Sequence, residues 1–211
     1  MSTRATPGYE GSLYSTGDST GFNDEPATVD GATATISDSA LSIFDWREDI
    51  TVEYGGVVVD PTTYEVKYLS GQIEFDTAPA GAVTISGNYL PRLELAGVFD
   101  ANFELSSEDI DSTDFSDSYL QSISGMGSAS GDFSTIAVGE VEDFVQDLEN
   151  REKKVLEHEI SSTGYKFRAV IFLESVNYTQ EASDRVEINF SYQSKSPASL
   201  TGGQASHVIY K

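Results

Sequence analysis

Apolar and polar residues alternate with a period of two through most of the chain, and this pattern predicts β-strands. Residues 50–54 place every second side chain on one apolar face, and Gly55-Gly56 then turns the chain into a second apolar run. The segment 60–91 repeats this arrangement around a turn at Ser70-Gly71. Because runs that are joined by such short turns pair as neighbours, we expect antiparallel sheet.

The clearest alternation is VFDANFEL, residues 98–105. One set of alternate positions is apolar and the other is polar: Phe99, Ala101, Phe103 and Leu105 against Asp100, Asn102 and Glu104. Successive side chains of a strand point to opposite faces of the sheet. We therefore expect a strand that packs on one side and meets water on the other.

Later segments add further strands and a helix. Residues 132–138 and 185–193 are predicted to be strands, and 165–176 is apolar on parts of both faces, which is typical of a strand covered on two sides. Between them, 140–150 has apolar residues at i, i+3, i+4 and i+7, with acids among them. This spacing predicts an amphipathic helix of about three turns.

The N-terminal segment differs from the remainder. Residues 1–25 are rich in Ser, Thr and Gly, which predicts an extended arm able to order against a neighbouring molecule. No change of composition divides 26–211, so we expect one β-rich domain there. The predicted fold is mainly β, an antiparallel β-sandwich or barrel-like structure with one flanking α-helix at about 140–150 and long loops.

The charge of the chain is unusual. Its 35 acidic and 12 basic residues give a formal net charge of −23, which repels the phosphates that nucleic-acid-binding proteins hold. Such charge serves solubility, metal binding, a negatively charged channel or survival in concentrated salt. In molar salt the screening length falls to roughly 3 Å, so self-repulsion of the folded chain largely vanishes. We favour a halophilic source.

Cysteine and membrane signals are missing from the sequence. The absence of cysteine excludes disulfides, thiol nucleophiles and cysteine-type zinc sites. The first residues lack the apolar core of a signal peptide, and no apolar run approaches the roughly 20 residues that span a bilayer. We expect a chain that stays in the cytoplasm until it is assembled and that contacts no membrane.

Candidate catalytic groups are few. His158 and His207 are the only histidines, and neither lies near a serine or cysteine motif that would complete a catalytic set. His158 alternates with Leu156 and Ile160, which favours a half-buried structural role. Phosphate-loop, dinucleotide-binding, zinc-protease and nucleophile-elbow motifs are absent. We therefore expect no enzymatic activity and no cofactor.

The segment 106–134 begins with clustered carboxylates, continues through a short apolar patch and ends in small residues. Asp109, Asp111 and Asp114 supply hard oxygen ligands of the kind that calcium binds. An EF-hand loop starting at Asp109 would need glycine sixth and glutamate twelfth, where the chain has Asp114 and Leu120. A looser calcium or sodium site and a solvated loop both remain open.

The order of these elements resembles that of the major tail tube proteins of long-tailed phages and archaeal viruses. The matching residues run from Asp109 to Phe115, continue with Tyr119, Leu120, Ile123 and Gly125, and end with Ser130-Gly131-Asp132-Phe133. The segment from Tyr64 to Leu90 also resembles a hairpin module that is common in phage tail structural proteins. The resemblance covers roughly residues 28–194, and the chain departs from it in its acidity and its strongly charged helix.

The resemblance implies a virion structural protein. Tail tube subunits form rings, usually hexameric, whose inner strands join into one continuous β-barrel, and the rings stack into a tube that delivers viral DNA. The implied partners are further copies of the chain, the tape measure, terminator and distal tail proteins, and DNA that only passes through the lumen. The chain would reside in the virion tail, and in the host cytoplasm before assembly.

The resemblance also assigns candidate site residues. Asp100, Asn102 and Glu104 would face the lumen, because DNA that passes must not adhere to it. An apolar patch lies in the long assembly loop at about 106–131, where a neighbouring subunit or ring would bury it: Phe115, Tyr119, Leu120 and Ile123.

Two other functions remain open at this point. One is a different tail or capsid component, such as a decoration or tail-completion protein, which the copy number in the virion would separate from a tube subunit. The other is a β-sandwich binding or surface module of a halophile. The single Trp46 and the missing signal peptide count against that module.

Overall fold

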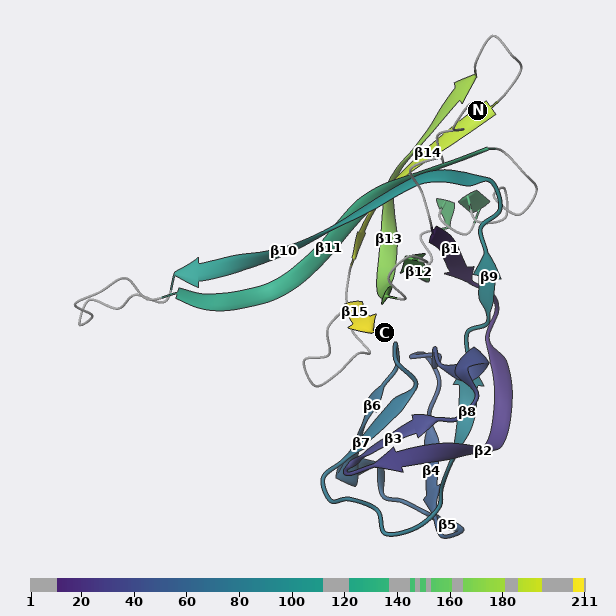
Figure 1. Ribbon diagram of the computed structural model, residues 1–211, viewed down its shortest axis with the longest axis vertical. Coiled ribbons are helices and arrows are strands. Elements are labelled where there is room, and N and C mark those ends of the chain that lie inside the picture. The colour runs from purple at the N-terminus through teal and green to yellow at the C-terminus, as the bar shows by residue number, and fades with distance from the viewer. Residues whose placement is uncertain are drawn as a thin grey trace, which may run out of the picture. The chain divides into compact units, whose positions relative to one another are not determined.

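The computed structural model describes residues 11–111, 122–136, 145–146, 149–150, 153–160, 165–180, 186–194 and 207–210 (Figure 1). Nearly all regular structure in these ranges is antiparallel β-strand in two sheets, which confirms the predicted fold class. The chain forms two compact units. The first unit comprises Met1–Leu13, Leu95–Ser196 and Ala205–Lys211, and the second comprises Tyr14–Glu94 and Pro197–Gln204.

The second unit contains a seven-stranded antiparallel sheet in the order β5-β4-β8-β2-β3-β7-β6. The strands are β2 (Thr20–Asp30), β3 (Thr33–Ile36), β4 (Thr51–Tyr54), β5 (Val57–Val58), β6 (Tyr64–Lys67), β7 (Gln72–Phe75) and β8 (Val83–Tyr89). The predicted hairpins are β4–β5 and β6–β7. Gly55 and Gly56 turn the first of them at φ values of 59° and 79°, which glycine adopts without a steric penalty.

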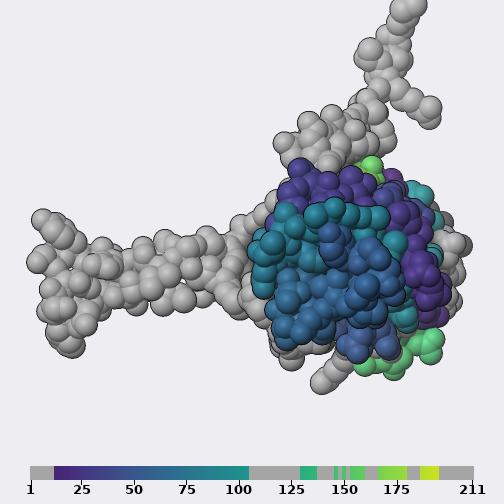
Figure 2. All heavy atoms as spheres, turned by 90° about the horizontal axis from the view of Figure 1, so that it is seen from below, coloured from purple at the N-terminus to yellow at the C-terminus, as the bar shows by residue number. Residues whose placement is uncertain are grey.

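Short helical turns and a dense core complete the second unit. The turns η1 (Ser39–Leu41) and η2 (Pro61–Thr63) each follow an aspartate, Asp38 or Asp60, whose carboxylate accepts a backbone N–H at 2.9 Å. Phe22 and Phe44 stack at 5.9 Å inside the core. Figure 2 shows the purple, blue and teal atoms of this unit closely packed against one another.

Strands β1 (Gly11–Thr16) and β9 (Arg92–Glu94) pair with each other, and the boundaries between the units fall at Leu13/Tyr14 and Glu94/Leu95. Within the predicted N-terminal arm, residues 11–16 and 20–25 are therefore in β-strands. Residues 1–10 lie outside the described part of the chain. The division of the chain into an arm and a single domain stays a prediction.

The first unit is built on six strands: β10 (Val98–Asp111), β11 (Ser122–Ile136), β12 (Lys154–Ile160), β13 (Tyr165–Gln180), β14 (Val186–Ser194) and β15 (His207–Tyr210). Its sheet runs β10-β11-β14-β13-β12 and continues into β1, while β15 pairs with β13. The strands predicted at 98–105, 132–138, 165–176 and 185–193 correspond to β10, β11, β13 and β14.

The long strand β13 belongs to two layers. Its residues Ile171–Gln180 pair with β14, and together with β11 (Ser130–Ile136) and β10 (Val98–Glu104) they form what we call the four-stranded layer. Its residues Tyr165–Ile171 pair with β12, and these two strands form the covering layer.

An aromatic contact shows that the two layers face each other. Phe103 of β10 stacks on Phe167 of β13 at a ring distance of 4.4 Å. In the plane of the sheet these strands are three positions apart, which corresponds to about 14 Å at the usual strand spacing. The sheet must therefore fold over on itself, so that the four-stranded and covering layers enclose one apolar core.

Two sequence predictions fall partly on residues that the structure describes. In the predicted helix at 140–150, Val145, Gln146 and Glu149 are helical, and the Asn150 N–H donates to the Gln146 carbonyl at 3.1 Å. The remaining residues of that helix lie outside the described part. No helix among the described residues is long and apolar enough to cross a membrane.

The prediction of a loop at about 106–131 needs correction at both ends of that segment. The structure continues β10 to Asp111 and begins β11 at Ser122, and the two strands remain paired as far as Asp111 and Ser122. Residues 112–121 lie outside the described part. The sequence suggested a loop because small and polar residues predominate in these strand ends, and the few apolar residues, Ile110, Ile123 and Met126, form no alternating pattern.

Candidate functional site

One face of the four-stranded layer is polar on every strand. The strand register places residues of β10, β11, β14 and β13 side by side in rows: Asn102, Asp132, Ser191 and Ser175 in one row, and Asp100, Ser134, Asn189 and Asn177 in the next. Glu104 follows in the next row, opposite Ser130. The alternation read along a single strand thus extends into a polar surface four strands wide.

Hydrogen bonds tie the polar side chains of adjacent strands together. The backbone N–H of Asp132 donates to the side-chain carbonyl of Asn102 at 3.1 Å, and the hydroxyl of Ser191 donates to Asp132 at 2.6 Å. In the next row, the Ser134 hydroxyl donates to Asn189 at 2.6 Å. Each bond crosses from one strand to its neighbour, so the polar groups are partly satisfied within the surface.

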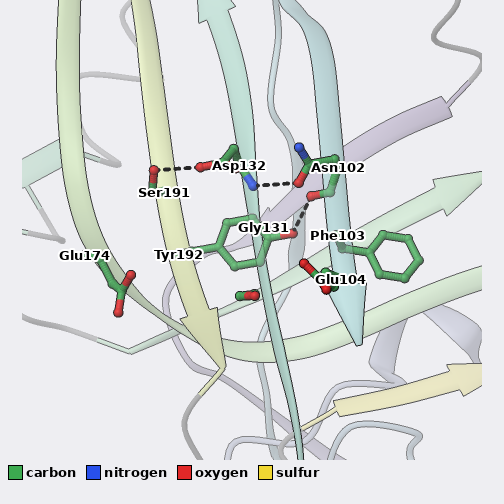
Figure 3. A pocket seen from close by; sticks show the side chains of 9 residues that line it. Asn102, Phe103, Glu104, Gly131, Asp132, Glu174, Ser191 and Tyr192 are labelled. Carbon is green, nitrogen blue, oxygen red and sulfur yellow. Dashed lines mark hydrogen bonds between the residues drawn. The ribbon is translucent and has the colours of Figure 1, made fainter. Parts of the chain in front are cut away.

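A shallow depression of about 470 Å³ lies in this polar face (Figure 3). The residues that line it include Glu104, Asp132 and Glu174, and no basic residue. Nor does the sequence contain a basic residue between Arg92 and Arg151. Clustered carboxylates without cations produce a negative local potential, which disfavours phosphate groups.

The opposite face of the same strands is apolar and packs into the core. Phe133 and Phe190 stack at 4.6 Å, and Phe103 meets both Phe167 and His158 of the covering layer. His158 is 8% exposed, and burial lowers the pKa of its imidazole below the usual value. This agrees with a structural role for that histidine.

Phe99 departs from the sequence prediction. Alternation placed it in the core with Ala101 and Phe103, yet Phe99 is 39% exposed and Val98 packs against the core. The register between β10 and β11 shifts between Val98 and Asp100, so Phe99 is an extra residue in the strand. A bulge of this kind inserts one residue and turns the local side chains, which alternation alone does not reveal.

Gly131 is a structural residue of the site that sequence reasoning missed. A Cβ at this position would lie 2.6 Å from the Tyr192 hydroxyl and would also collide with the Asn102 carbonyl oxygen. The ring of Tyr192 passes beside Gly131, and its hydroxyl donates to the Asn102 carbonyl at 3.0 Å (Figure 3). A glycine inside a strand is the signal that could have indicated such a close approach.

Both edges of the four-stranded layer are free in the described part of the chain. β10 pairs with β11 only, and β13 beyond Ile171 pairs with β14 only, because β12 ends its pairing at Ile171. All three pairings within the layer are antiparallel, so the two edge strands, β10 and β13, run in opposite directions. Unpaired backbone groups on such edges are ready to bond another strand.

Beyond the four-stranded layer, β10 and β11 continue as a two-stranded ribbon (Figure 1). Among the described residues, β14 pairs with β11 only from Ser130 to Ile136, so Ser122–Ala129 pairs with β10 alone. An isolated pair of strands is at best marginally stable in water. The ribbon is therefore expected to gain stability from a neighbouring surface.

Several predicted site residues lie on this ribbon or beyond it. The backbones of Asp109, Asp111 and Ile123 belong to it, whereas Asp114, Phe115, Tyr119 and Leu120 lie outside the described residues. In the part that the structure describes, no group of three or more His, Asp or Glu could hold a metal ion. The cation site and the apolar contact patch therefore stay predictions.

Comparisons with known proteins give weak similarities. No protein-family model matches the chain, and no curated protein matches it. Among solved structures, it is similar to a chain in the tail of an empty gene transfer agent particle with C6 symmetry, at 16% identity and a TM-score of 0.43, over 51% of this chain and 84% of that chain.

A chain in the virion of a native gene transfer agent particle is similar at 15% identity and a TM-score of 0.43, over 50% of this chain and 85% of that chain. Similarity at this level carries no conclusion about function.

Proposed function

We propose that this chain is the repeating subunit of a viral tail tube. In this proposal, copies join through their four-stranded layers into rings, the rings stack, and the polar faces line the channel that delivers viral DNA. The observation that carries the proposal is a single layer that is polar on one face, packed on the other and free at both edges.

The directions of the strands support joining between identical copies. Because the edge strands β10 and β13 run in opposite directions, β13 of one copy meets β10 of the next as an antiparallel pair. The same junction repeats at every contact and leaves no free edge once a ring closes. Polar rows then continue into polar rows, and the packed face stays on the outer side.

The chemistry of the polar face supports a channel lining. Asp100, Asn102 and Glu104 are exposed on the face opposite the core, and Asp132 lies beside them. Each phosphate that a cationic side chain held would add affinity and slow the passage of DNA. A lining with acids and amides but without cations avoids such contacts.

The ribbon of β10 and β11 is proposed to contact the adjacent subunit or ring. Two strands without a third are marginal in isolation, so a neighbour that packs against the ribbon would stabilise it. The predicted patch of Phe115, Tyr119, Leu120 and Ile123 would supply the apolar contact. Further tail proteins would meet the two ends of the tube.

The net charge of −23 supports a virus whose host lives in concentrated salt. Screening at molar salt removes most of the repulsion between acids within a subunit and between subunits. Assembly should consequently require molar KCl or NaCl and should reverse on dilution.

Electron microscopy of the purified chain tests the proposed function. At high protein concentration in molar salt we expect stacked rings or tubes, with density for the four-stranded layer around the channel. A chain that stays monomeric under these conditions, and that is found outside the tail in the source virion, would contradict the proposal.

Two variants separate the roles of the ribbon and the polar face. Replacing residues 107–127 by an Asn-Gly turn between Ser106 and Ser128, which already pair, should leave a folded subunit that forms no tubes. Asp100→Lys with Asp132→Lys should still assemble, but the tubes should bind DNA in a salt-dependent manner. Tubes that persist without the ribbon would show that it is only a surface extension.

A further inference from the structure

Two exposed aromatic side chains distinguish the edges of the four-stranded layer. Among the described residues of the first unit, the large apolar side chains that remain exposed are Phe99, at 39%, and Tyr178, at 60%. Phe99 lies on the free edge strand β10, and Tyr178 lies on the free part of β13. Each free edge therefore presents one large apolar side chain.

The register places the two aromatics at the same level of the sheet. Val98, the residue before Phe99, pairs with Thr135 of β11. Thr135 also pairs with Ile188 of β14, and Ile188 pairs with Tyr178 of β13. A junction that continues these rows into the next copy would bring its Phe99 close to Tyr178. Directly opposed residues in antiparallel strands have Cα atoms about 4.5–5.5 Å apart.

Both side chains also belong to the apolar side of the layer. Tyr178 is opposite the buried Ile188, on the same face as Val176, which packs against the core. At the bulge, Val98 and Phe99 together oppose Thr135 of β11, which is buried on the core side. Contact between the two aromatics would consequently form on the outer side of a ring and would not touch the channel.

We propose that Phe99 of one copy packs against Tyr178 of the next copy and that this contact fixes the register of the junction. The inference rests on the proposed function in one respect, namely that copies join edge to edge. A second copy is the occupant that fits, because one chain supplies both halves of the contact, in antiparallel strands, at the same row. Aromatic pairs pack favourably, and an edge with an exposed apolar side chain otherwise promotes non-specific aggregation.

The absence of cysteine provides a direct test by crosslinking. The double variant Phe99→Cys/Tyr178→Cys should form disulfides between copies when assembled protein is oxidised in molar salt. Because each copy then carries one thiol at each edge, a head-to-tail chain of covalent bonds should appear as a ladder on a non-reducing gel. Either single variant can reach a covalent dimer at most.

A matched control uses a thiol that is equally accessible but lies elsewhere. Val57 is 69% exposed and belongs to the second unit, so Phe99→Cys/Val57→Cys should give no ladder beyond the level of chance dimers. A ladder from this control that matched the one from the 99/178 pair would overturn the inference, since the disulfides would then report only accessibility.

Assembly of alanine variants provides a second measurement in case the cysteine variant fails to assemble. Phe99→Ala and Tyr178→Ala should each raise the critical concentration for assembly by about tenfold, and the double variant should raise it far less than the product of the two. Unchanged critical concentrations in both single variants would overturn the inference.

The outcomes separate this inference from the proposed function. Tubes without a ladder, in which oxidation yields dimers at most, would reject the aromatic junction and leave the tube subunit intact. Failure of the unmodified chain to form rings or tubes in molar salt would reject both. A ladder that ends at the mass of a closed ring would support both.

Discussion

The two parts of β13 provide the most instructive comparison within the molecule. From Phe167 to Ala169 the strand pairs with β12 on one side and with β15 on the other, and Phe167–Ile171 is buried. From Glu174 onward it has a neighbour on one side in the described chain, and Ser175, Asn177 and Thr179 are exposed. One continuous strand therefore serves as interior in the covering layer and as an open edge in the four-stranded layer.

The covering layer and the four-stranded layer also differ in how their charged side chains are stabilised. In the covering layer, Arg168 pairs with Glu157 of β12, and their side chains are 2% and 1% exposed. The four-stranded layer keeps its carboxylates, such as Asp100 and Glu104, at the surface. Burial demands an ion pair for a charged group, whereas water solvates the exposed carboxylates directly.

The largest expected effect tests this contrast through the buried ion pair. Glu157→Ala leaves the Arg168 guanidinium buried without its carboxylate partner, so we expect a loss of about 3–5 kcal/mol in the free energy of unfolding. Urea denaturation in molar salt measures it. Asn177→Ala, in the exposed part of β13, should change stability by less than about 0.5 kcal/mol. Equal losses would abolish the distinction between the two parts.

The next effect concerns the packing within the four-stranded layer. Gly131→Ala should destabilise the first unit by about 1–3 kcal/mol, because the added methyl group meets both the Tyr192 hydroxyl and the backbone of β10. Gly21→Ala is the matched control, since the atom nearest to its new Cβ is 3.7 Å away. If both variants unfold at the same urea concentration, the close approach at Gly131 is not required.

The contact between the layers should depend on pH through His158. Burial lowers the pKa of its imidazole in the folded state, so below its unfolded value of about 6.5 the unfolded chain binds more protons. Stability should therefore fall as the pH drops from 7.5 to 5.5, by at most about 1.4 kcal/mol per pH unit. His158→Gln should flatten this dependence in thermal unfolding. A flat profile for the unchanged protein would contradict the expectation.

The smallest effect isolates one hydrogen bond. Tyr192→Phe keeps the ring beside Gly131 but removes the hydroxyl that donates to the Asn102 carbonyl. We expect a loss of about 1 kcal/mol, which is typical of one buried hydrogen bond. Hydrogen exchange should locate the change at the pairing of β10 with β11. An unchanged exchange pattern there would indicate that packing alone holds the strands together.

The sequence predicts strands well wherever each face has a constant environment. β10, β13 and β14 follow from alternation or from apolar residues on both faces, as in 98–105 and 165–176. β2 is missed because Phe22 is the one buried residue of its 11, so no regular apolar face identifies it. The strand ends at 106–111 and 122–131 are missed because small and polar residues predominate there and the few apolar residues do not alternate.

The candidate site follows from the sequence only in part. Alternation places Asp100, Asn102 and Glu104 on one face of one strand. Their neighbours Asp132 and Ser191 become visible only once the register of β11 and β14 is known, and register depends on pairing between distant segments. The bulge at Phe99 changes that register locally, which the pattern of a single strand cannot reveal.

The continuity of β13 has a mechanical consequence. Its free part and its buried part form a single strand of 16 residues, Tyr165–Gln180. Tension applied along the free part is transmitted to a segment that pairs with β12 on one side and with β15 on the other. The backbone hydrogen bonds between antiparallel strands are perpendicular to the strand direction. Tension along the strand therefore acts on all of these bonds at the same time, as shear, and does not break them one after another. A neighbour that pairs with the free edge would thus be anchored through Phe167–Ile171, which are buried in the core of the unit.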